Sequence, residues 1–109
     1  MTLIKALEKL VNENKHSSSN LDFSNTLIQQ LSLQDKDYLE SWFTNVKVFN
    51  LQNTDLKSLQ NFPHLPNLKC LILTNNNLTD RDIEYIRSLP ELSVIHLDHN
   101  NIRDLHAIS

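Results

Sequence analysis

The chain contains no glycine, although a protein of 109 residues would ordinarily hold roughly seven or eight. Glycine is the usual residue where the backbone enters the left-handed region, and asparagine tolerates that region better than most other residues. Asparagine is abundant, notably at Asn75, Asn76, Asn77, Asn100 and Asn101. We therefore expect asparagine to turn the chain. The absence of glycine also excludes a glycine-rich loop that could cradle phosphate.

Cysteine, clustered basic charge and long apolar runs are scarce as well. Cys70 is the single cysteine, so an intramolecular disulfide is impossible, which is typical of a reducing compartment. The formal net charge is -3 and the basic residues are scattered, so we expect no nucleic acid partner. The N-terminal segment MTLIKALEKLVNENK carries lysines and glutamates among its apolar residues, so it lacks the core of a secretory signal, and no stretch approaches the length of a membrane span. We expect a cytoplasmic protein with no membrane partner.

The shares of hydrophobic and charged residues and the length of the chain are typical of one folded domain. Hydrophobic residues make up 39% of the chain and charged residues 21%, which is near the values of soluble globular proteins and far from a disordered composition. A chain of 109 residues has room for one modest core. We expect residues 1–109 to form a single domain.

The segment LKCLILTNNNL, residues 68–78, fits neither a helix nor a plain strand along its whole length. Its apolar residues at 68, 71, 73 and 78 and its asparagine at 76 recur at the same spacing in LSVIHLDHNNI, residues 92–102. VKVFNLQNTDL, residues 46–56, and SSNLDFSNTLI, residues 18–28, carry threonine in the asparagine position, and the latter has serine in the first apolar position. The equivalent residues Phe23, Leu51, Leu73 and Leu97 follow one another at intervals of 28, 22 and 24 residues.

This pattern resembles the leucine-rich repeat family, whose consensus is L-x-x-L-x-L-x-x-N/C-x-L with 20 to 29 residues per repeat. The resemblance covers residues 18–109 and is to the intracellular type, which has no cysteine caps. It implies an α/β fold, a solenoid with a short parallel sheet on its concave face and short helices, 3₁₀ turns or coil on its convex face. We expect four repeats, of which the last is incomplete.

The spacing also has a physical reading that does not depend on the family. In a strand, Leu71 and Leu73 point to one face while Cys70, Ile72 and Thr74 point to the other, so one face can enter a core. The residue three positions after the second leucine can satisfy backbone groups that would otherwise be buried without partners. We expect a ladder of such residues at Thr26, Thr54, Asn76 and Asn100.

The connections after each strand carry their own signals. Apolar residues at every third position and the prolines Pro63 and Pro66 predict coil rather than a helix between 57 and 68. Helical spacing predicts an amphipathic helix over 35–43, in which we expect Trp42 to pack on the core, with a partner-binding anchor as the alternative. A short helix is expected over 81–88, capped by Asp80.

The two ends of the stack are expected to differ. Apolar residues on one helical face predict a helix within residues 1–17 that caps the first repeat, followed by a linker. At the other end, Leu105 and Ile108 begin a connection that does not finish, and no cap is visible. Edge-to-edge pairing of two copies through this last repeat is one way to cover it.

The residues that point away from the leucine face are the candidate binding surface, because leucine-rich repeat proteins typically hold partners on the concave face. An apolar centre with a polar margin suits a protein partner. The candidate residues are Asp22, Ser24, Val48, Asn50, Gln52, Cys70, Ile72, Thr74, Val94, His96, Asp98 and His99.

Two kinds of chemistry are conceivable for the same residues. His96 and His99 form an H-x-x-H pair, but on a strand they point to opposite faces, so we expect no metal site and no cofactor. Cys70 and His96 could approach diagonally across neighbouring strands, but a nucleophile would also need an orienting group and an oxyanion hole. We expect no catalytic residue and no enzyme.

The sequence therefore predicts a non-enzymatic module for protein–protein interaction, such as a scaffold or regulatory adaptor. The alternative is an inhibitor, a small bacterial immunity protein that neutralises a cognate toxin by masking its active site. In that case Asp22 and Asp98 would face a basic partner. A Cys–His enzyme is the remote third possibility.

Overall fold

The computed structural model describes residues 2–103. Its elements follow one another along the chain, and each strand is three residues long. They are α1 (Leu3–Asn12), β1 (Asn20–Asp22), α2 (Leu33–Trp42), β2 (Val48–Asn50), β3 (Cys70–Ile72), the 3₁₀ helix η1 (Asp80–Tyr85) and β4 (Val94–His96). No helix within residues 2–103 is long and apolar enough to cross a membrane.

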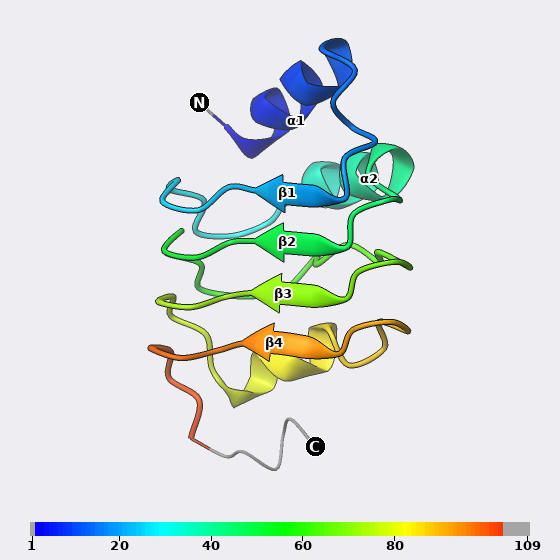
Figure 1. Ribbon diagram of the computed structural model, residues 1–109. Helices are drawn as coiled ribbons and strands as arrows, with labels where there is room; N and C mark the ends of the chain where they lie inside the picture. The colour runs from blue at the N-terminus through cyan, green and yellow to red at the C-terminus, as the bar shows by residue number, and fades with distance from the viewer. Residues whose placement is uncertain (1, 104–109) are drawn as a thin grey trace.

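The strands form one four-stranded sheet in the order β1-β2-β3-β4, and every neighbouring pair is parallel. Figure 1 shows the strands stacked with their arrows in one direction, α1 beyond β1 at the end of the stack, and α2 and η1 on the same side of the sheet. The register aligns Leu21, Phe49, Leu71 and Ile95, the same residues that the repeat aligns in the sequence. The α/β class with a short parallel sheet is confirmed, and the arrangement is compatible with a leucine-rich repeat fold.

The core lies between the sheet and the connections on its far side. Leu71 and Leu73 have 0% of their surface exposed, as the strand alternation predicts. The apolar residues at every third position of the connection between β2 and β3, Leu59, Leu65 and Leu68, are also fully buried. No helix forms between 57 and 68, as the prolines predict.

The connection after β3 differs from the prediction in helix type and in cap. A 3₁₀ helix over Asp80–Tyr85 replaces the helix expected over 81–88, because Ile83, Ile86 and Leu89 recur at the three-residue period that suits a 3₁₀ turn. Asp80 is not the cap. The carboxylate of Asp82 accepts hydrogen bonds from the backbone N–H groups of Thr79, at 2.9 Å, and Leu59, at 3.0 Å.

Positive φ angles recur at one position of every repeat, directly after the strand region. They are 63° at Asn25, 56° at Asn53, 60° at Asn75 and 60° at His99. Of the five asparagines named from the sequence, only Asn75 has this conformation. The prediction that asparagine turns the chain is therefore correct in kind, but it missed Asn25 and Asn53.

The asparagine ladder forms in the later repeats. The side-chain oxygen of Asn76 accepts hydrogen bonds from the backbone N–H groups of Thr54, at 3.1 Å, and Leu56, at 2.9 Å. Its amide nitrogen donates to the carbonyls of Leu51, at 3.0 Å, and Leu73, at 2.9 Å. One amide therefore links two successive repeats.

The other ladder positions show how the network ends. Asn100 accepts a hydrogen bond from the Leu78 N–H at 3.0 Å, so it links the next pair of repeats in the same way. Thr54 is fully buried, and its hydroxyl donates to the Leu51 carbonyl at 2.9 Å. Thr26 is exposed and its side chain bonds no described residue, because no earlier repeat lies beside it. The prediction of a ladder residue at Thr26 is therefore wrong.

Helix α1 contacts α2 at the start of the stack, and Leu7 of α1 is fully buried. At the other end, Ile95 and Leu97 are only partly buried, whereas Leu71 and Leu73 in the preceding repeat are fully buried. Leu105 and Ile108, which the sequence pattern assigns to a last connection, lie outside the described residues.

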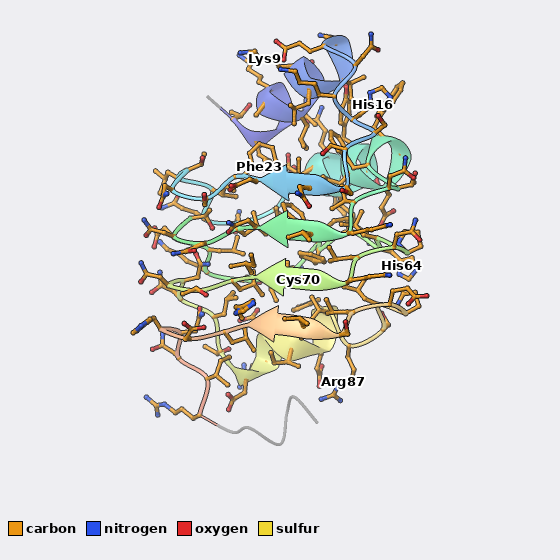
Figure 2. All side chains as sticks on the ribbon, in the orientation of Figure 1. Lys9, His16, Phe23, His64, Cys70 and Arg87 are labelled. Carbon is orange, nitrogen blue, oxygen red and sulfur yellow. The ribbon has the colours of Figure 1, made fainter. Side chains whose placement is uncertain are left out.

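Trp42 does not pack in the core as expected, because 45% of its surface is exposed. The centroid of its ring lies 5.3 Å from the ring centroid of His16 and 6.4 Å from that of Tyr38. Figure 2 places His16 in the connection between α1 and β1, beside α2. The next residue, Phe43, takes the core position instead and is 1% exposed. The helical spacing placed the pair correctly but could not decide which aromatic ring points inward.

Candidate functional site: the outward face of the sheet

The face of the sheet that points away from the leucine core is the candidate site, and we call it the outward face. On every strand the middle residue is the most buried and its two neighbours are more exposed, so the first and third residues share the outward face. Of the candidate residues from the sequence, seven are first or third strand residues: Asp22, Val48, Asn50, Cys70, Ile72, Val94 and His96. The other five follow the strands: Ser24, Gln52, Thr74, Asp98 and His99.

Apolar side chains gather at the starts of the middle and last strands. The register places Val48 beside Cys70 and Cys70 beside Val94, so three small apolar groups form one row across the sheet. Ile72 lies on the same strand, two residues after Cys70, which Figure 2 labels on β3. Val48, Cys70 and Ile72 are half-buried and Val94 is 45% exposed, so this row is open to solvent.

Polar groups follow at the ends of the strands, and several are fixed by local hydrogen bonds. The Asp22 carboxylate accepts a bond from the Ser24 N–H at 2.9 Å, and Asn50 accepts one from the Gln52 N–H, also at 2.9 Å. Hydrogen bonds from the side chain and the backbone of Ser24 lower the pKa of Asp22 below its ordinary value. These turns hold both polar side chains in place at the margin of the apolar row.

The last two strands meet at a second polar contact, where the Thr74 hydroxyl donates to the Asp98 carboxylate at 3.4 Å. The side chains of Gln52, His96 and His99 form no hydrogen bond with any residue in the described part of the chain. These three side chains therefore offer donors and acceptors that the fold does not use.

A row of asparagine side chains borders the face, and the sequence pattern alone did not single it out. The amide nitrogen of Asn53 donates to the side-chain oxygen of Asn25 at 2.9 Å, and that of Asn75 donates to Asn53 at 3.2 Å. His99 has the same position in the last repeat. The signal was present, because all four residues stand at the same place in the repeat.

Two exposed lysines at the strand starts were also missed. Lys47 and Lys69 each directly precede an outward-facing strand residue, Val48 and Cys70. The alignment of the repeats places them in equivalent positions, but a basic cluster sought only as a run along the chain does not include them.

Cys70 and His96, the candidate catalytic pair, are not joined by the hydrogen bond that a nucleophile and its base need. Cys70 stands opposite Val94, and His96 stands opposite Ile72, so Cys70 and His96 are diagonal neighbours. No hydrogen bond joins them. Within residues 2–103 no three histidine, cysteine, aspartate or glutamate side chains form a group that could hold a metal ion.

No family model matches the chain. It is 41% identical over 56 residues, 51% of its length, to the probable U2 small nuclear ribonucleoprotein A' of Drosophila melanogaster, and this match covers 21% of that protein. It is 35% identical over 66 residues, 61% of its length, to the fly acidic leucine-rich nuclear phosphoprotein 32 family member A, covering 25% of it. It is 36% identical over 77 residues, 70% of its length, to the U2 small nuclear ribonucleoprotein A' of Candida albicans, covering 33% of it.

These matches support a leucine-rich repeat family. The chain spans no more than 33% of the length of any of these three relatives. None of the three names describes an enzyme, which favours a non-enzymatic function. The bacterial immunity protein finds no support, because the relatives are nuclear proteins of a fly and a yeast.

The expected cytoplasmic location is wrong. All three relatives carry the word nuclear in their names. The expectation of a reducing compartment, which rested on the single cysteine, is equally compatible with the nucleus, so this feature could not separate the two locations.

Proposed function

We propose that this chain is a leucine-rich repeat solenoid that serves as a non-enzymatic protein-binding module. Its outward face, which is the concave face of such a solenoid, binds the partner. The open row of Val48, Cys70 and Val94, with Ile72 beside it, is the observation that carries the proposal. Half-exposed apolar groups inside a polar margin match the anatomy of a protein interface.

The rigidity of the face supports the same function. The backbone that follows the strands is held by the Asn76 and Asn100 amides and bordered by the row of Asn25, Asn53 and Asn75. A surface that is already ordered loses little conformational entropy on binding, so more of the contact energy appears as affinity.

The names of the relatives suggest the setting. Two of the three are components of a ribonucleoprotein and the third is a nuclear phosphoprotein, so we propose that this chain works in a nuclear assembly. A ribonucleoprotein contains RNA as well as protein. Asp22 and Asp98 on the outward face and the net charge of -3 favour protein as the ligand of this face.

The test compares one variant of the face with one matched control. Ile72→Asp places a carboxylate in the apolar centre, and Leu27→Asp makes the same kind of change at a residue that is 70% exposed and lies outside the strands. Each purified chain is immobilised, incubated with an extract of nuclei, and the retained proteins are quantified by mass spectrometry. We expect a set of proteins that the original chain and Leu27→Asp retain and that Ile72→Asp loses.

The proposal is refuted if Ile72→Asp, folded by circular dichroism, retains the same proteins as the original chain. It is equally refuted if only Leu27→Asp loses them, because the binding surface would then lie near the connection after β1.

Pairing of two copies through the last repeat stays a proposal beside this one. The partly buried Ile95 and Leu97 support it, because a further strand alongside β4 would cover them. Sedimentation equilibrium separates the alternatives: a mass of twice 12.7 kDa supports the pairing, and a single 12.7 kDa species contradicts it.

A further inference from the structure

Two lysines stand side by side where the strands begin. The Lys69 N–H donates to the Lys47 carbonyl at 2.8 Å, so the two residues are direct neighbours on adjacent repeats. Serines occupy the outer places of this row, because the Lys47 N–H bonds the Ser19 carbonyl at 2.7 Å and the Ser93 N–H bonds the Lys69 carbonyl at 3.0 Å. Both lysines are exposed.

The fold does not compensate this pair of positive charges. Neither lysine forms an ion pair with a carboxylate of the described residues. Like charges directly opposite each other on adjacent strands destabilise a sheet. A pair of like charges that weakens the fold and makes no stabilising contact is typical of a functional surface.

The lysine pair adjoins the apolar row of the outward face. Val48 follows Lys47 and Cys70 follows Lys69 in the chain. The carboxylates of Asp22 and Asp98 lie toward the other ends of the strands, at or after the last strand residue. Along the strand direction, positive charge therefore precedes the apolar row and negative charge follows it.

We propose that the partner presents a protein segment in which a carboxylate side chain meets Lys47 and Lys69 while an apolar side chain covers Val48, Cys70, Ile72 and Val94. This inference rests on the proposed function and adds the chemistry of the partner. A nucleic acid is the weaker candidate for this face, because its phosphates would also meet Asp22 and Asp98. The polarity of the face fixes the direction in which the segment binds.

The experiment measures binding of defined probes to the ¹⁵N-labelled chain by nuclear magnetic resonance. The probes are a terminally blocked peptide with two leucines between pairs of glutamates, the same peptide with glutamine or lysine in place of glutamate, and a uridine hexanucleotide. We expect the glutamate peptide to shift the amide signals of residues 47–48 and 69–72 and to bind about threefold to tenfold more tightly than the glutamine peptide, because two exposed charge contacts are added.

Charge reversal provides the matched comparison. Lys47→Glu with Lys69→Glu should reverse the preference, so that the lysine peptide binds best. Lys9→Glu with Lys57→Glu changes the same charge at two other exposed residues and should leave the preference for the glutamate peptide unchanged. Lys69→Glu alone should raise Tm by about 1–3 °C, because it places opposite charges side by side.

Equal binding of the glutamate and glutamine peptides overturns the inference. Binding of the hexanucleotide alone, lost on reversal of the two lysines, also overturns it and assigns the pair to RNA. The failure of the proposed function is separate, because that function is tested by Ile72→Asp in the extract. If Ile72→Asp still loses its partners while the peptides do not distinguish charge, only the chemistry assigned to Lys47 and Lys69 is wrong.

Discussion

Replacement of Asn76 by alanine tests whether one buried amide holds successive repeats together. Asn76 is 7% exposed, and its side-chain oxygen is the acceptor for the backbone N–H groups of Thr54 and Leu56. Alanine removes this acceptor and leaves both buried donors without a partner. The carbonyls of Leu51 and Leu73 are less affected, because the Thr54 hydroxyl and the Asn100 amide still donate to them.

The expected magnitude follows from these two orphaned donors. A buried polar group without a hydrogen bond costs about 1–3 kcal/mol, so Asn76→Ala should lower the free energy of unfolding by about 2–6 kcal/mol. A domain of this kind has about 5–15 kcal/mol in total, so the variant should be folded only marginally. Asn77→Ala is the control, because Asn77 is exposed and its amide makes one surface bond, to Asp55 at 2.7 Å.

Urea denaturation followed by circular dichroism measures both variants. We expect Asn77→Ala to stay within about 1 kcal/mol of the original chain, the usual worth of one exposed hydrogen bond. If the two variants lose the same free energy, the buried amide does not connect the repeats and the reasoning is refuted. An Asn76→Ala chain that is already unfolded without urea agrees with the upper end of the expected range.

Three further changes test other parts of the structure, the first two by the same urea denaturation and the third by thermal unfolding at several pH values. Leu73→Ala removes a fully buried side chain and should cost about 2–5 kcal/mol, whereas the neighbouring outward-facing Thr74→Ala should cost less than about 1 kcal/mol; equal losses would contradict the strand alternation. Asn75→Ala places a residue that disfavours the left-handed region at a φ of 60° and should cost about 1–2 kcal/mol, and Asn75→Gly should not; equal losses would show that the amide contact to Asn53, and not the backbone angle, matters. Hydrogen bonds from Ser24 lower the pKa of Asp22 in the folded chain, so its carboxylate stabilises the fold at pH values above 3.8, the pKa in the unfolded chain, and this contribution disappears as the pH falls through the folded pKa. Asp22→Asn should therefore lower Tm slightly near neutral pH and not at low pH. A difference in Tm that does not depend on pH would contradict this assignment.

The repeat and its register could be predicted because burial imposes them on the sequence. Every position equivalent to Leu71 must be apolar to enter the core, so the spacing of apolar residues alone marks the strands and their alignment. The coil after β2 could be predicted for a similar local reason, since proline removes a backbone donor and fixes φ.

Other features depend on neighbours that one segment does not reveal. Thr26 matches the ladder position in sequence, but a ladder residue needs an earlier repeat to bond, and none lies beside it. Trp42 and Phe43 have similar apolar character, and only the orientation of α2 decides that Phe43 is buried. The lysine pair is invisible along the chain, because Lys47 and Lys69 become neighbours only through the stacking of the repeats.

The reactivity of Cys70 gives the most direct measurement of the central claim that the outward face binds a protein. Cys70 is the only cysteine, and it lies half-buried in the apolar row of that face. Its rate of labelling by a small maleimide is measured in the free folded chain and in the complex recovered from the nuclear extract. The account predicts prompt labelling of the free chain and strong protection in the complex; an unchanged rate in the complex would contradict it.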